Sequence, residues 1–99
     1  MSDAATQTRL RMIRYRAWHR GIRETDLILG PFADQRVAGL TPTQLDAFEA
    51  LLEQPDQILY AWITGEETAP DDVQGDVFSM IQAFRVAQDV SSQMGWIQE

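Results

Sequence analysis

The chain of 99 residues has room for one small domain and none for separate cofactor and substrate domains. Cysteine is absent and histidine occurs once, at His19, which excludes disulfides and thiolate metal sites and disfavours zinc centres and Ser-His-Asp triads. The net charge is −7, and no stretch reaches the roughly 18 uncharged apolar residues of a membrane span.

The charge is unevenly distributed along the chain. Residues 1–36 hold seven arginines and four acids, a net charge of +3, whereas residues 37–99 hold one arginine and eleven acids, a net charge of −10. We therefore expect a basic end and an acidic end.

Helical periodicity dominates, and no run alternates cleanly enough for a strand, so the sequence predicts an all-α fold. A first helix is expected over Arg9 to His19, with Gly21 after it as a left-handed cap. Arginines separate two apolar strips on this helix: Leu10, Ile13 and Ala17 form one, and Met12, Tyr15 and His19 the other. The pattern predicts a helix that packs on two sides.

A second helix is expected from Arg23 through Leu29, with Gly30-Pro31 as its stop. Its apolar set is Leu27, Ile28 and Phe32. The two helices are therefore expected to meet at Gly21.

The clearest start signal is Thr41-Pro42-Thr43-Gln44, a capping box with proline at the first helical position. The third helix that follows has one apolar face, made of Leu45, Phe48, Leu51 and Leu52. Its acids, Asp46, Glu49 and Glu53, are expected to stay in solvent.

Pro55 interrupts the helical pattern, and a fourth helix is expected from Asp56 to a stop at Gly65. Residues 66–72 are acidic and predict a loop rather than a calcium site, because they lack the Asp-x-Asp-x-Asp-Gly order. A last helix should begin within residues 70–73 and include Gly75, with Val77, Met80, Ile81 and Phe84 at helical spacing. From Gln88 the pattern weakens, and Trp96 and Ile97 either dock on the body or belong to a frayed tail.

The densest candidate site lies in residues 15–26, which hold arginines, aromatic residues, the only histidine, a glycine and two acids. The simplest interpretation is a solvated basic helix whose Trp18 helps to fill the core. A nucleic-acid interface is an alternative, with arginines on phosphates and Tyr15 and Trp18 stacking on bases, although the acidic remainder opposes it. No phosphate-binding glycine loop and no credible nucleophile occur.

Arg20-Gly21-Ile22-Arg23-Glu24 resembles the Arg-Gly-x-x-Glu motif of the SdhE family of succinate dehydrogenase assembly factors. The resemblance covers about residues 9–65 with order and spacing preserved. It continues through four further segments: Trp18 to Gly21, Asp26 to Ala33, Phe48 to Asp56 and Leu59 to Gly65.

The resemblance implies a single bundle of about five helices that binds the flavoprotein subunit of succinate dehydrogenase, and in some bacteria of fumarate reductase. Such a protein promotes covalent attachment of FAD to its client, is no enzyme and holds no FAD or metal stably. Arg20, Gly21 and Glu24 match the motif and inherit its role as a partner surface, where Gly21 would allow close backbone approach. His19, Trp18 and Arg23 are the neighbouring candidates for partner binding.

Two other hypotheses stay open at this point. One is a small flavin-binding enzyme that transfers FAD directly, and the other is an arginine-rich nucleic-acid-binding or general protein-interaction module. The expected organisation is a flexible N-terminus over residues 1–8, a helical domain over residues 9–87 and a tail over residues 88–99. With no export signal or presequence before the first helix, we expect a bacterial cytoplasmic protein rather than one of the mitochondrial matrix.

Overall fold

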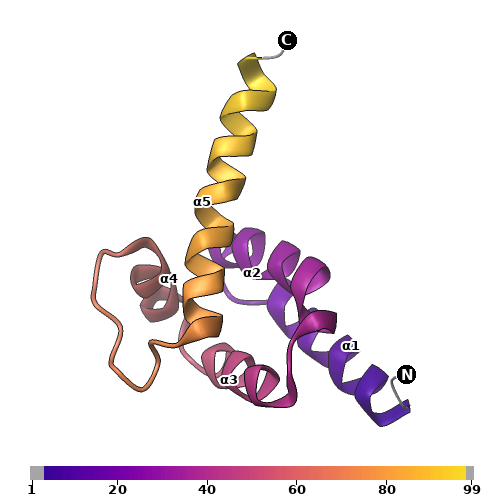
Figure 1. The fold of residues 1–99 in the computed structure, drawn as a ribbon. Helices are drawn as coiled ribbons and strands as arrows, with labels where there is room; N and C mark the ends of the chain where they lie inside the picture. Colours follow the sequence, from indigo (N-terminus) through magenta and orange to yellow (C-terminus); the bar gives the residue numbers. More distant parts are fainter. Residues whose placement is uncertain (1–3, 98–99) are drawn as a thin grey trace.

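The computed structural model describes the backbone of residues 4–97 and the side chains of residues 4–88. No strand occurs in this part of the chain, so the predicted all-α fold with about five helices is confirmed. The elements are α1 (Ala4–Trp18), α2 (Arg23–Arg36), the 3-10 turn η1 (Val37–Gly39), α3 (Pro42–Leu52), α4 (Asp56–Thr64) and α5 (Asp76–Ile97) (Figure 1).

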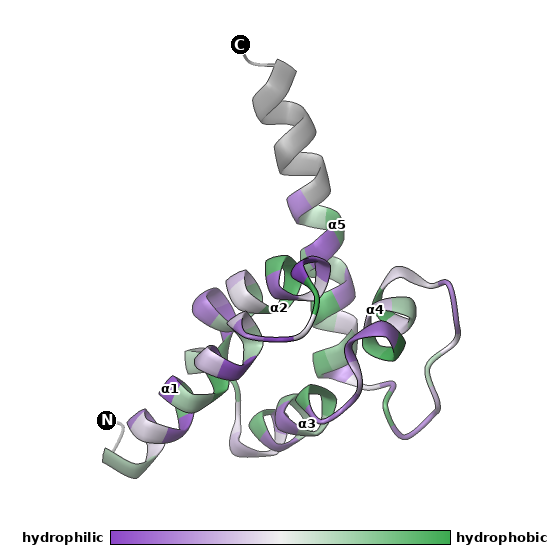
Figure 2. Cartoon of the chain, turned by 180° about the vertical axis from the view of Figure 1, so that it is seen from behind, coloured by the Kyte–Doolittle hydropathy of each residue, from purple (hydrophilic) through white to green (hydrophobic). Residues whose placement is uncertain are grey.

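Helix α2 lies at the centre of the bundle, because it contacts α1, α4 and α5. Helix α3 packs against α5 and α1. Figure 2 shows apolar stretches on each of the helices around this core, beside polar ones. Three aromatic side chains join the helices: the ring centroid of Phe32 lies 5.4 Å from that of Phe48 and 5.6 Å from that of Phe84. All three rings are buried, so α2, α3 and α5 share one aromatic cluster.

Among the described residues, α1 packs through only one of its two apolar strips, so the prediction that it packs on two sides is wrong for contacts within this part of the chain. Its Leu10, Ile13 and Ala17 are buried. In the other strip Met12 is 61% and Tyr15 65% exposed. The helix begins at Ala4, inside the stretch expected to be a flexible N-terminus, and its last residue is Trp18 rather than His19.

The predicted stop at Gly30-Pro31 is wrong, because α2 continues through both residues to Arg36. Pro31 lacks the N–H that would bond to the carbonyl of Leu27, a loss that costs an exposed helix about 3 kcal/mol. Here the residues on either side of Pro31 are buried, including Phe32 and Ala33, and burial of that apolar surface offsets the loss. Leu27, predicted to belong to the apolar set, is 49% exposed.

The predicted capping box of α3 is confirmed. The Thr41 hydroxyl accepts from the backbone N–H of Gln44 at 3.1 Å, and the side-chain oxygen of Gln44 accepts from the backbone N–H of Thr41 at 2.9 Å. The apolar face is buried as predicted, at Leu45, Phe48, Leu51 and Leu52.

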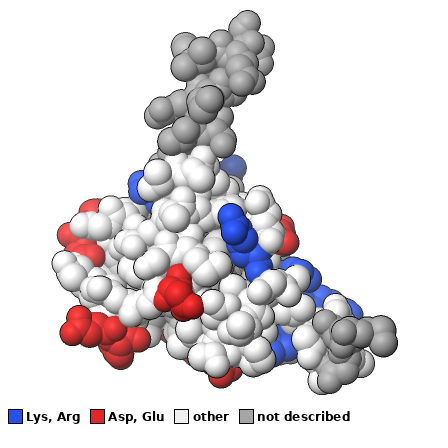
Figure 3. All heavy atoms as spheres, viewed as in Figure 1, with Lys and Arg blue, Asp and Glu red and all other residues white. Residues whose placement is uncertain are grey.

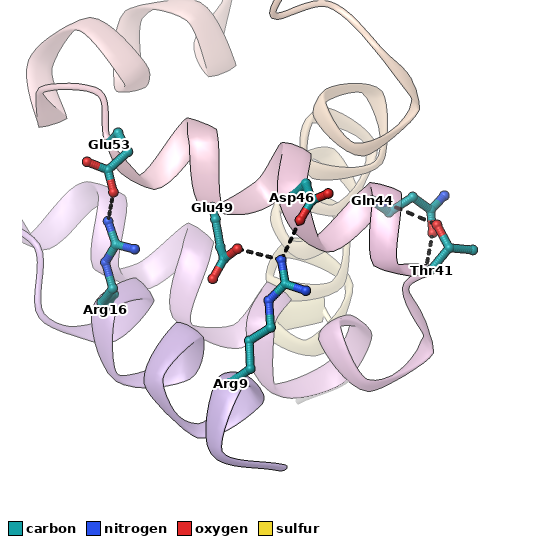
Figure 4. A network of polar contacts seen from close by, with 7 residues as sticks. All are labelled: Arg9, Arg16, Thr41, Gln44, Asp46, Glu49 and Glu53. Atoms are coloured by element: carbon teal, nitrogen blue, oxygen red, sulfur yellow. Dashed lines mark hydrogen bonds and ion pairs between the residues drawn. The ribbon is translucent and has the colours of Figure 1, made fainter. Parts of the chain in front are cut away.

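Asp46 and Glu53 stay in solvent as predicted, at 74% and 69% exposed, and Glu49 is half-buried at 34%. All three acids also pair with arginines of α1 (Figure 4). Arg9 lies 2.6 Å from Asp46 and 2.5 Å from Glu49, and Arg16 lies 2.6 Å from Glu53. Hydrogen bonds to Glu49 and Asp46 raise the pKa of Arg9 further above its usual value. These pairs join the basic part of the sequence to the acidic part, so the two charged ends are in contact.

Helix α4 ends at Gly65 as predicted, with φ of 85° in the left-handed region. The acidic stretch after it is a loop. Helix α5 begins at Asp76 instead of within residues 70–73, so Gly75 lies outside it, where it adds no glycine cost to the helix. Within α5, Val77, Ile81 and Phe84 are buried as their spacing predicts.

The backbone of α5 is helical through Ile97, across the expected boundary at residue 88. The two alternatives for Trp96 and Ile97, docking on the body or a frayed tail, concern side chains outside the described ones. Within the described residues, no helix is both long and apolar enough to cross a membrane.

Candidate functional site

The predicted site residues lie at the joint between α1 and α2, where residues 19–22 connect the two helices. The structure places all six within this joint or at the adjoining helix ends: Trp18, His19, Arg20, Gly21, Arg23 and Glu24. Their environments differ sharply, so the six do not form one uniform surface.

Arg20 is fixed inside the molecule, with a side chain only 9% exposed. Its Nε donates to Asp56 Oδ1 at 2.5 Å, and its other two guanidinium nitrogens donate to the backbone carbonyls of Leu52 and Gln54. Leu52 is the last residue of α3, where a carbonyl has no intrahelical partner, and Gln54 lies in the turn that leads to α4. The guanidinium satisfies both carbonyls. The arginine of the motif therefore ties the α1–α2 joint to the α3–α4 turn.

Gly21 allows a close approach from Asp56, whose Oδ2 accepts from the Gly21 N–H. A Cβ added at Gly21 would lie 2.5 Å from that oxygen, closer than real Cβ atoms approach their neighbours. The expected left-handed cap at Gly21 is wrong, because Gly65 is the glycine with positive φ in the described chain. A larger residue at position 21 would therefore have to displace the Asp56 carboxylate.

A second carboxylate closes the joint from the α2 side. The Arg20 N–H donates to Asp26 Oδ1 at 2.8 Å. Asp26 lies in the first turn of α2, where a negative charge also complements the helix dipole. The backbone of the joint is thus held by Asp26 on one side and by Asp56 on the other.

Trp18 lies across α2 and is 36% exposed, so it fills the core only in part. A Cβ at Gly30 would overlap its indole ring. The indole Nε1 donates to Asp34 Oδ2 at 3.1 Å. Gly30, predicted to stop the helix, instead makes room for Trp18, and neither Gly30 nor Asp34 was predicted to belong to this site.

His19 is exposed and turned back along α1. Its Nδ1 lies 2.8 Å from the Tyr15 carbonyl oxygen, and its ring stacks on that of Tyr15 with centroids 4.0 Å apart. Arg23 and Glu24 occupy the first turn of α2 and are exposed. Neither has a side-chain partner among the described residues, so both are free to contact another molecule.

A groove of about 770 Å³ lies beside Glu24, between α2, α4 and α5. Leu27, Ile28, Tyr60 and Phe84 contribute its apolar lining. The sequence analysis did not identify this groove, because it depends on how three helices pack. Its only local signal is the spacing of Glu24 and Leu27 on one face of α2.

The surface charge follows the same division as the sequence. In Figure 3 blue arginines lie over the part of the surface near α1 and α2, and red carboxylates lie mainly around α4 and the loop that follows it. On the face drawn in Figure 3, the arginines of α1 and α2 are thus separated from most of the carboxylates.

Residues 11–85 match the model of the Sdh5 family, described as flavinator of succinate dehydrogenase. The chain belongs to this family. The matched range contains Arg20, Gly21 and Glu24, so the resemblance inferred from their motif is confirmed at the level of the family.

Curated relatives carry names of the same kind. The FAD assembly factor SdhE of Acetobacter pasteurianus is 36% identical over 64 residues, which cover 65% of this chain and 59% of that protein. Succinate dehydrogenase assembly factor 2, mitochondrial, of Dictyostelium discoideum is 35% identical over 68 residues, which cover 69% of this chain and 48% of that protein. The zebrafish (Danio rerio) protein of that name is 26% identical over 92 residues, covering 91% and 58%. In these three alignments the chain spans about half the length of each Sdh5-family relative.

Proposed function

We propose that this protein is an assembly factor that binds the flavoprotein subunit of succinate dehydrogenase and promotes covalent attachment of FAD to it. The observation that carries the proposal is the placement of the family motif on the α1–α2 joint. Asp56 holds Arg20 and the Gly21 N–H in this joint, while Glu24 is exposed and has no partner among the described residues. A pre-ordered edge binds with less loss of conformational entropy than a mobile loop.

The motif residues have different roles in this proposal. Arg20 and Gly21 are positioning residues, because their polar groups are engaged with Asp56 and with backbone carbonyls of this chain. Glu24 is the contact residue and offers a carboxylate to an arginine or another donor of the client. Arg23, His19 and Trp18 are further candidates for contact with the client.

The chemistry belongs to the client in this proposal. The isoalloxazine must be held against a histidine of the client while electrons move into the ring, and a partner that orders the client around its flavin supplies that geometry. This chain then needs neither a nucleophile nor a stable FAD site of its own. It acts on FAD only through the client, as a non-enzymatic factor.

The range of clients and the location are also part of the proposal. We include the flavoprotein subunit of fumarate reductase as a second client where a cell makes one. We assign the protein to the bacterial cytoplasm, with support from the relative in Acetobacter pasteurianus, although the Dictyostelium and zebrafish relatives are named as mitochondrial.

The test compares Glu24→Ala with Glu67→Ala, a control that removes an exposed acid from the loop after α4. We expect Glu24→Ala to weaken binding to the purified flavoprotein subunit about tenfold, as loss of a charge-assisted contact does, and the control to bind like the parent. In cells without the native copy, the same variant should lower the fraction of client with covalent flavin. A parent protein that neither binds the subunit nor changes that fraction refutes the proposal.

The non-enzymatic role has a separate test. Titration of the purified protein with FAD should give no heat signal, and the protein should carry no yellow chromophore. Stable FAD binding by the protein alone would instead favour direct transfer and contradict the role proposed here.

A further inference from the structure

The outward face of α1 carries a stripe that no other described part of the chain covers. We call Thr8, Met12, Tyr15 and His19 the outer stripe. Met12 and Tyr15 are the two most exposed large hydrophobic side chains in the described chain, at 61% and 65%. A soluble protein seldom leaves two such side chains side by side without a partner.

The spacing of the outer stripe suits a helix as its partner. Its members follow one another at intervals of four, three and four residues, which is the repeat of a coiled-coil seam. Thr8, Met12 and Tyr15 also line a shallow hollow of about 430 Å³ on α1. A helix laid along α1 would place its own apolar side chains in that hollow.

Arginines border the outer stripe, and their positive charge favours a partner with acidic residues. Arg11 and Arg16 line the same hollow from either side. Arg16 already pairs with Glu53, whereas Arg11, and Arg14 one turn further on, have no carboxylate partner among the described side chains. A docking helix is therefore favoured if Asp or Glu flanks its apolar residues.

We propose that the outer stripe docks a helix of the flavoprotein client, one whose apolar face is bordered by carboxylates. The stripe reaches the α1–α2 joint directly, since His19 stacks on Tyr15 and immediately precedes Arg20. A helix docked along α1 would therefore reach the α1–α2 joint. The identity of the partner rests on the proposed function, while the preference for an acidic helix rests on α1 itself.

Two other occupants fit these observations less well. A second copy of this chain, docked through the same stripe, would bring Arg11 and Arg16 against their own counterparts, and like charges at close range oppose that contact. RNA would have to contact the thioether of Met12 at the centre of the stripe, a side chain with no aromatic face for a base and no charge for a phosphate. Arg9 and Arg16 are also already neutralised by α3.

The experiment uses Met12→Glu, which places a negative charge in the middle of the stripe. Position 12 is exposed and glutamate is a good helix former, so the variant should fold like the parent. The matched control is Val86→Glu on α5, where the side chain is 55% exposed and lies outside the stripe. Tyr15→Ala is a second variant, which removes an apolar anchor without adding charge.

We expect Met12→Glu to weaken binding to the purified flavoprotein subunit at least about tenfold, because it sets like charges against each other in a closed contact. Tyr15→Ala should weaken binding by about five- to tenfold, as truncation of an interface aromatic does, and Val86→Glu should bind within about twofold of the parent. Unchanged affinity of both stripe variants, beside a parent and a Glu24→Ala variant that behave as proposed, overturns this inference and leaves the proposed function standing. If the parent itself fails to bind the subunit, the proposed function fails and the partner named here fails with it. Two further results overturn the inference in favour of another occupant: a dimer in light scattering that Met12→Glu dissociates, or binding of single-stranded RNA that Met12→Glu abolishes at physiological salt.

Discussion

The ion pair between Arg20 and Asp56 gives the sharpest test of the structure. Asp56→Ala removes the carboxylate that accepts from both the Arg20 guanidinium and the Gly21 N–H. The two side chains are 9% and 15% exposed, so the arginine left behind is a largely buried charge without its counter-ion. Breaking a buried pair from one side costs about 3–5 kcal/mol.

The lower end of that range applies here, since Arg20 keeps the carbonyls of Leu52 and Gln54 as acceptors. A loss of about 3 kcal/mol in a domain of this size lowers the melting temperature by about 12–24 °C. Thermal unfolding followed by circular dichroism measures it. The control is Asp46→Ala, which breaks an exposed pair with a carboxylate 74% exposed.

The control should change the melting temperature by no more than about 3 °C, because solvent screens exposed pairs. A double variant, Arg20→Met with Asp56→Ala, should recover part of the loss, since it removes the unpaired charge as well. If Asp56→Ala melts within about 4 °C of the parent, the buried pair does not hold the joint and the assignment of Arg20 as a positioning residue is wrong.

Three further substitutions test the fold around the site. Phe48→Ala should lower the free energy of unfolding, measured in urea, by about 3–5 kcal/mol, because it removes the ring that contacts Phe32 and leaves a cavity. A loss below about 1 kcal/mol would place Phe48 outside the core. Gly30→Ala should displace Trp18 from α2, shift its fluorescence to longer wavelength and cost about 1–3 kcal/mol, and an unshifted spectrum would contradict the contact. Thr41→Ala removes the side-chain cap of α3 and should lower the free energy of unfolding by about 1 kcal/mol. Thr41→Ser keeps a hydroxyl at this position and should therefore retain most of the parent's stability.

Local signals in the sequence predicted the parts of the fold that local forces decide. The capping box at Thr41 and the glycine at Gly65 mark helix ends through contacts within a few residues, and both were predicted correctly. The stop at Pro31 was predicted wrongly, because burial of Phe32 against α3 and α5 decides the continuation of α2. No window of sequence around Pro31 contains that information.

The site shows the same division. The motif located Arg20 and Gly21, but their common partner Asp56 lies 36 residues beyond Arg20, and no spacing rule joins them. Sequence reasoning placed Arg20 on a partner surface, whereas its guanidinium is occupied within the chain. Gly30 was misjudged for a related reason, since its role depends on Trp18 from a different helix.

The attachment of the α1–α2 joint to the α3–α4 turn also limits how the motif can be used outside this protein. A synthetic peptide that spans α1 and α2 would contain Arg20, Gly21 and Glu24, but not Asp56 or the two carbonyls that orient the arginine. In such a peptide the guanidinium would point into solvent and the backbone at Gly21 would be unrestrained. An inhibitor or affinity reagent based on this motif therefore has to include the chain at least through the start of α4, or replace Asp56 with a designed constraint.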